Sequence, residues 1–136
     1  MHDNGKGEVD DARDALDYLL MAQPHAHEVL VAGFSFGSVI GLKLGCQDSR
    51  VSRMLSIGTS VRLHSLDFLG TCAKPIVFVH GEADDLAPLA PLRERLDELP
   101  GTSHRKLIVI PTAGHFFDQH LPELMTTISS EFGEAG

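Results

Sequence analysis

The sequence of 136 residues contains little that would cross-link it or hold it in a membrane. It has no tryptophan, one tyrosine and two cysteines. Two cysteines, Cys46 and Cys72, are too few for a disulfide framework, so we expect both to be reduced thiols. Apolar runs such as residues 29–33 fall far short of the ~20 residues that cross a bilayer, and residues 1–8 lack the apolar core of a signal peptide. We therefore predict a cytoplasmic protein that spans no membrane.

Positive charge is also scarce. Eleven Lys and Arg residues stand against nineteen Asp and Glu residues, which gives a formal net charge of -8. Such a charge repels polyanions, so we expect neither nucleic acid nor an anionic membrane surface as a partner. The sequence also lacks the motifs of phosphate-binding loops, dinucleotide-binding loops and helical zinc sites. We therefore expect no metal and no cofactor.

Apolar residues make up 43% of the chain and recur with two different periods. Spacings of three or four predict helices, and short continuous runs rich in β-branched residues predict strands buried on both faces. The predicted elements are helices at 8–23, 36–47, 88–99 and from 117, and strands at 28–34, 53–57, 75–80 and 106–110. Residues 61–73 are the least regular part, with one short helix expected around residues 65–69. This order predicts a single α/β domain over residues 1–136, with a parallel sheet of about four strands and helices on both faces.

A Gly-x-Ser-x-Gly motif, with Ser35 at its centre, lies directly between a predicted strand and a predicted helix. Glycines at this junction permit a sharp turn that lifts the serine hydroxyl above the sheet, at the positive end of the helix. The motif therefore predicts a nucleophilic serine. The alternative is an ordinary turn in which Ser35 only caps the helix.

A serine needs a base to take its proton and an acid to orient that base. Two loops that follow predicted strands carry the candidates: Asp84 and Asp85 in the first, His115 in the second. The order serine, aspartate, histidine is the one used by α/β-hydrolases. All three positions lie at the carboxyl edge of the predicted sheet, where open α/β folds bind ligands.

Three segments around these residues, 31–38, 79–88 and 111–118, resemble blocks of the small, lid-poor bacterial α/β-hydrolases. The resemblance is closest to the group described as predicted hydrolases, akin to dienelactone hydrolases, and extends from residue 7 to about residue 132. It implies that Ser35 is the nucleophile, Asp84 the acid and His115 the base, with the backbone N–H of Phe36 as an oxyanion-hole donor. In that family the acid is the third residue after a His-Gly pair, which selects Asp84. Asp85 stays open as the alternative acid.

The sequence also departs from this family. Full α/β-hydrolases have about four more strands ahead of the helix that here is expected at 8–23, so the front half of the fold is expected to be absent. The second oxyanion donor normally comes from that half. The strand that begins at Glu28 and ends at Phe34 would then be an exposed apolar edge. We expect this edge to be covered by a second copy of the chain or by a separate polypeptide.

These observations predict a serine hydrolase of small carboxylic esters or thioesters. Phe34 and Phe116 would line an apolar substrate pocket, although ordinary core packing explains such rings equally well. The alternative is a hydrolase-like scaffold without turnover that binds a ligand or a partner chain.

Two further features have structural explanations. Gly41 and Gly45 weaken the predicted helix at 36–47, and close packing of that helix on the sheet would account for them. His80 ends a predicted strand, where it could form a hydrogen bond near the site, and we expect its role to be structural.

Overall fold

The computed structural model describes residues 6–23, 25, 28–62, 64–101 and 104–133. Its centre is one sheet of four parallel strands in the order β1-β2-β3-β4, which is also their order in the chain. The strands are β1 (Leu30–Phe34), β2 (Arg53–Ile57), β3 (Ile76–Gly81) and β4 (Arg105–Ile110). The helices are α1 (Lys6–Ala22), α2 (Phe36–Gln47), the 3-10 helix η1 (Asp67–Thr71), α3 (Leu89–Glu98) and α4 (Leu121–Phe132). The predicted α/β class, with about four parallel strands, is confirmed.

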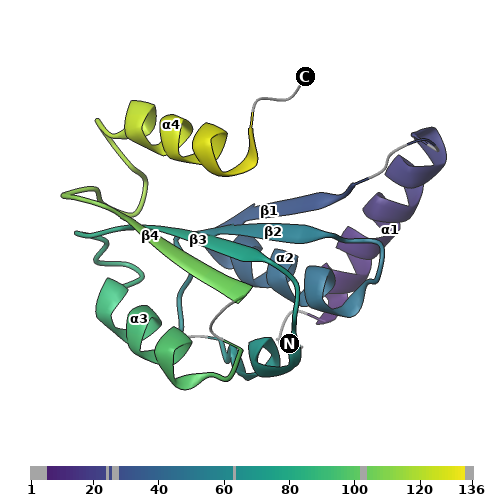
Figure 1. The fold of residues 1–136 in the computed structure, drawn as a ribbon, viewed down its shortest axis with the longest axis horizontal. Helices are drawn as coiled ribbons and strands as arrows, with labels where there is room; N and C mark the ends of the chain where they lie inside the picture. Colours follow the sequence, from purple (N-terminus) through teal and green to yellow (C-terminus); the bar gives the residue numbers. More distant parts are fainter. Residues whose placement is uncertain (1–5, 24, 26–27, 63, 102–103, 134–136) are drawn as a thin grey trace.

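Helices cover both faces of the sheet (Figure 1). Successive side chains of a strand point to opposite faces, so one strand contributes to two separate apolar clusters. Met54 and Phe78 pack on the side of α2, η1 and α3. Their neighbours Leu55 and Val79 pack with Leu124 on the side of α4. This alternation explains why consecutive residues of β2 and β3 are apolar along much of each strand.

The glycines of α2 allow that helix to lie close against the sheet. A Cβ atom at Gly41 would lie 3.1 Å from Cγ1 of Val31, and one at Gly45 would collide with the side chain of Met54. The expectation of close helix-to-sheet packing is confirmed. The other side of α2 is covered by α1 through a smaller cluster that includes Val9, Ile40 and Leu44.

Burial of β1 differs from the prediction. A continuous apolar run predicts burial on both faces, but Leu30 and Phe34 are 39% and 40% exposed. The apolar cluster beneath α4 contains side chains of β2, β3 and β4 and none of β1. In the described part of the chain β1 pairs with β2 alone, so it is an edge strand with one uncovered face.

The last helix begins later than predicted. Phe117 and Gln119 have positive φ angles of 55° and 65°, which an α-helix does not tolerate. Residues 117–120 therefore form part of a loop, and α4 begins at Leu121. Phe117 turns its ring into the core, where it is 1% exposed. The short helix expected around residues 65–69 is η1, two residues further along the chain.

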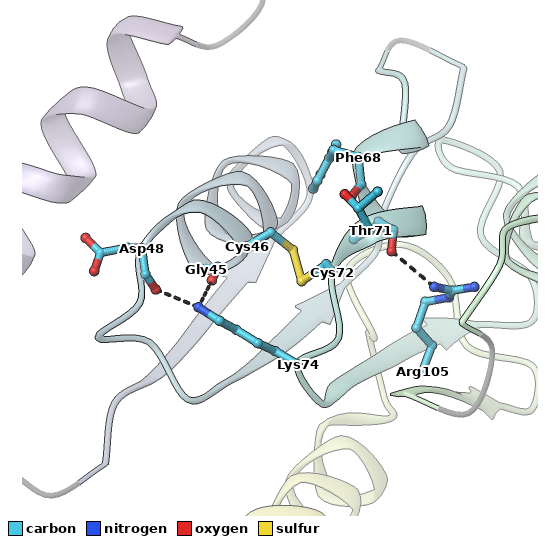
Figure 2. Close-up of a disulfide and its surroundings, with 9 residues drawn as sticks. Gly45, Cys46, Asp48, Phe68, Thr71, Cys72, Lys74 and Arg105 are labelled. Atoms are coloured by element: carbon cyan, nitrogen blue, oxygen red, sulfur yellow. Dashed lines mark hydrogen bonds between the residues drawn. A yellow bond between two sulfur atoms is a disulfide. The ribbon is translucent and has the colours of Figure 1, made fainter.

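The expectation of reduced cysteines is wrong. Cys46, near the end of α2, forms a disulfide with Cys72, just after η1, and the two Cα atoms lie 5.6 Å apart (Figure 2). The two residues are 26 positions apart in the sequence, and only the packing of η1 against α2 brings them together. The cysteine count therefore no longer supports the predicted cytoplasmic location, which stays a prediction. None of the helices in the described ranges is long and apolar enough to cross a membrane.

Candidate active site

Ser35 occupies the sharp turn between β1 and α2. Its backbone has φ 58° and ψ -124°, a combination that is strained for a residue with a side chain. The turn is tight because Gly33 has no Cβ atom; a Cβ there would collide with the backbone of Gly37. The Ser35 N–H donates a 2.8 Å hydrogen bond to the Ile57 carbonyl of β2, which ties the turn to the sheet.

The alternative in which Ser35 caps α2 is wrong. Its side chain makes no capping hydrogen bond. Ser38 instead donates from its hydroxyl to the Ser35 carbonyl, at 2.5 Å. The Ser35 hydroxyl is directed away from the helix and lies 3.0 Å from Nε2 of His115.

His115 and Asp84 complete a line of hydrogen bonds. Nδ1 of His115 lies 2.7 Å from Oδ2 of Asp84, and both residues are buried. A carboxylate only accepts hydrogen bonds, so Nδ1 carries the proton and Nε2 presents a lone pair to Ser35. The structure thus brings together three residues from separate loops, of which Ser35 and His115 are 80 positions apart in the sequence.

The carboxylate of Asp84 is held on both of its oxygens. Oδ1 accepts from the backbone N–H groups of Leu86, at 3.0 Å, and Ala87, at 2.7 Å. Oδ2 is thereby left for His115. Asp85, the alternative acid, is exposed. Asp84, and not Asp85, is therefore the carboxylate that accepts the hydrogen bond from His115.

The loops after β3 and β4 are locked to each other. A Cβ atom at Gly81 would collide with the carbonyl of Ala113, so the backbones of the two loops approach closely there. Ala83 N–H donates to that same carbonyl at 2.8 Å, and Thr112 N–H donates to the side chain of Glu82 at 3.0 Å. The acid and the base are therefore positioned by one joint structure.

Aromatic side chains surround the serine and the histidine. The Phe34 ring lies 5.1 Å from the His115 ring and 6.0 Å from the Phe116 ring, and Phe116 meets His115 edge-on at 5.0 Å. Phe34 is 40% and Phe116 is 61% exposed, so core packing does not explain them. Phe36, also 40% exposed, contacts the buried His64 at 5.0 Å. Its backbone N–H belongs to the first turn of α2, at the positive end of the helix.

Sequence reasoning missed one wall of this site. Gly58 follows β2 with a φ of 65°, and a Cβ atom there would lie 3.1 Å from Cε1 of His115. Its position directly after a strand, at the same sheet edge as Ser35 and Asp84, was the available signal. Within the described residues, no group of three or more His, Cys, Asp or Glu side chains is placed to hold a metal ion.

The sequence of the chain is similar to part of a longer protein. An uncharacterized protein of Rickettsia prowazekii (strain Madrid E) is 33% identical over 133 residues, which cover 93% of this chain and 56% of the relative. The chain thus spans little more than half the length of that relative. No model of a known protein family matches the sequence.

Several solved structures have a fold similar to that of the chain. An α/β serine hydrolase homologue from Coxiella burnetii superposes with a TM-score of 0.87 at 26% identity, over 97% of this chain and 62% of that one. A serine α/β hydrolase without a lid, from Xanthomonas campestris, gives a TM-score of 0.81 at 24% identity, over 96% of this chain and 57% of that one. The chain therefore has the α/β-hydrolase fold of small serine hydrolase homologues, and it spans about three fifths of their length.

Proposed function

We propose that the protein is a serine hydrolase that cleaves small carboxylic esters or thioesters by acyl transfer. The observation that carries this proposal is the line of hydrogen bonds from the Ser35 hydroxyl through His115 to Asp84, at 3.0 and 2.7 Å. The first distance lies within the range over which a base takes a proton from a nucleophile, and the second is a hydrogen bond that can orient this base.

In the proposed reaction the Ser35 oxygen attacks the substrate carbonyl while Nε2 of His115 accepts the serine proton. His115 then returns that proton to the leaving alcohol or thiol, and the acyl group stays on Ser35. A water molecule, deprotonated in turn by His115, attacks the acyl group; the bond to Ser35 breaks, the acid leaves, and His115 returns the proton to the Ser35 oxygen. Asp84 holds the ring in the required tautomer and stabilises its cation, since its carboxylate accepts from Nδ1–H throughout.

The N–H of Phe36 is the proposed donor to the oxyanion. It is the first residue of α2, directly after Ser35, so the helix dipole favours negative charge at this point. The family resemblance places a second donor ahead of α1. Removal of one such donor typically costs about 10²–10³ in turnover. The turnover rate therefore depends on whether a second N–H group donates to the oxyanion.

The aromatic side chains favour an apolar substrate. Phe34 and Phe116 lie beside His115, the group that protonates the leaving group, and both are accessible to solvent. An apolar alcohol or thiol moiety would cover these rings on binding, and burial of apolar surface is favourable at roughly 25 cal/mol per Å².

A second candidate function is a hydrolase-like scaffold that binds a ligand or a partner chain without turnover. It is favoured by the outer edge of β1, which pairs with no second strand among the described residues.

Labelling with a fluorophosphonate distinguishes the two candidates. A serine activated by His115 reacts with this probe, whereas an ordinary serine does not. We expect stoichiometric labelling of the chain and none of the Ser35→Ala variant, measured by intact-protein mass spectrometry. Equal labelling of both proteins would overturn the hydrolase, and no labelling of either would favour the scaffold.

A further inference from the structure

His80 is a buried ionisable residue that the proposed reaction does not use. It is the penultimate residue of β3, four positions before Asp84, and its side chain is fully buried. Burial lowers the pKa of His80 below its ordinary value of 6.5, so the ring is neutral at physiological pH. Histidine is rarely buried so completely, which calls for a reason at this position.

The hydrogen bonding of the ring determines its tautomer. Nε2 lies 2.5 Å from the carbonyl oxygen of Ala87. A carbonyl only accepts, so Nε2 carries the hydrogen and Nδ1 has a lone pair. Nδ1 is buried and has no hydrogen-bond partner among the described residues. An unpaired polar atom costs stability, and an apolar side chain of similar volume would avoid that cost. Core packing alone therefore does not explain a histidine here.

The bond from His80 closes the loop that holds the acid. Ala87 is bound at both of its backbone groups: its N–H donates to Oδ1 of Asp84 at 2.7 Å, and its carbonyl accepts from His80. Nε2 of His80 also lies 3.6 Å from Oδ2 of Asp84, the oxygen that His115 uses. The single Nε2–H of the neutral ring is already donated to the Ala87 carbonyl, so His80 affects Asp84 through Ala87 and not through a direct hydrogen bond.

We propose that His80 is a positioning residue, which holds the Asp84 carboxylate in the orientation that His115 requires. It acts through Ala87: its Nε2–H donates to the Ala87 carbonyl and so fixes the end of the loop whose Ala87 N–H holds Oδ1 of Asp84. The catalytic consequence rests on the proposed hydrolase function, whereas the geometric consequence for the bond between His115 and Asp84 does not.

Two matched variants test the proposal. His80→Gln keeps an N–H donor at the end of a side chain of similar reach, and His80→Leu keeps a similar apolar volume without a donor. The first readout is the low-field proton resonance of His115 Nδ1–H, which reports directly on its bond to Asp84. The second is the second-order rate of fluorophosphonate labelling. Thermal unfolding of each variant shows whether it is folded.

We expect His80→Leu to lose or shift the low-field resonance and to label about tenfold more slowly, because small displacements of a catalytic group cost one to two orders of magnitude. His80→Gln should recover most of both signals. An unchanged resonance and rate in folded His80→Leu would overturn the proposal. An equal loss in both folded variants would also overturn it, since the donor would then not matter.

Nitrogen NMR of the unmodified protein decides the question if neither variant folds. We expect the His80 ring to be neutral with its proton on Nε2 at physiological pH, and a proton on Nδ1 under these conditions would overturn the proposal. If the protein does not react with fluorophosphonate at all, the hydrolase proposal fails, while the resonance of His115 still tests the role of His80.

Discussion

Strain at a single residue is the local feature on which the site depends. Ser35 adopts a positive φ, which costs a non-glycine residue about 1–3 kcal/mol. The turn is held by the hydrogen bond from Ser35 to β2 and by the close approach that Gly33 permits. In return, the hydroxyl projects from the end of β1 toward His115 instead of folding back onto α2.

The neighbouring aspartates Asp84 and Asp85 offer a matched pair at this scale. We expect Asp84→Asn to lower the labelling or hydrolysis rate by roughly 10³–10⁴, because an amide that donates to the histidine favours the wrong tautomer. Asp85→Asn removes the same charge from an exposed position and should leave the rate nearly unchanged. Rates with an activated ester would measure both, and a larger loss in Asp85→Asn would contradict the assignment of the acid.

The lowered pKa of Asp48 predicts how the stability of the fold depends on pH. Its side chain accepts hydrogen bonds from the Arg50 side chain at 2.8 and 2.7 Å, and these bonds lower the pKa of Asp48 from 3.8 to about 2. A depressed pKa means that the folded protein binds fewer protons than the unfolded chain. The stabilisation is therefore complete above about pH 4 and is lost as the pH falls toward 2.

The Asp48→Asn variant removes this contribution. We expect its free energy of unfolding in urea to fall less steeply between pH 4 and pH 2 than that of the unmodified protein. Asp97→Asn, which removes an exposed carboxylate of α3, should keep the original slope. Identical slopes for all three proteins would show that Asp48 makes no such contribution.

At the scale of elements, the end of α2 is joined to the segment around η1 by two separate devices. The first is the disulfide between Cys46 and Cys72. The second is the ammonium group of Lys74, which donates to the carbonyls of Gly45 and Asp48 at 2.6 Å each (Figure 2). A cation at the carboxyl end of a helix satisfies carbonyls that lack partners and interacts favourably with the helix dipole.

Reduction of the disulfide should destabilise the fold without unfolding it. Closing a loop of 26 residues corresponds to about 3.5 kcal/mol in the chain-entropy treatment. We expect a reductant to lower the free energy of unfolding by about that amount in urea titrations. The double variant Cys46→Ala and Cys72→Ala should be insensitive to the reductant, and a similar response in that variant would mean that the reductant acts elsewhere.

At the scale of the whole molecule, the sheet has two unlike edges. Both β1 and β4 have one strand neighbour in the described part of the chain, but α4 packs on one face of β4 through the cluster that includes Ile110, whereas β1 contributes no side chain to that cluster (Figure 1). Exposed apolar edge strands form templates for pairing with other chains. We propose that the isolated chain pairs through β1 with a second copy of itself.

Light scattering after size exclusion tests this pairing. We expect self-association of the chain at high concentration and a shift toward monomer in Ala32→Lys, which places a charge on the exposed side of β1. Ser129→Lys adds the same charge to an exposed position of α4 and should leave association unchanged. A soluble monomer at every concentration would overturn the proposal.

The sequence by itself determined the order of elements and the positions of the three site residues. Helix and strand periods depend on neighbours within a few residues, so α2 and β2 have the predicted bounds. The carboxyl ends of parallel strands meet at one sheet edge, and this rule alone predicts that loops carrying Ser35, Asp84 and His115 converge.

Only the tertiary structure decided which side chains touch across the fold. The disulfide, the contact of Gly58 with His115 and the bond from His80 to Ala87 all depend on how loops and helices pack. The family resemblance favoured Asp84 over Asp85, but the residues themselves left both open, and only the folded loop shows that Asp84 turns inward to His115 while Asp85 is exposed. Such contacts are set by the packing of distant segments, which short-range patterns do not encode.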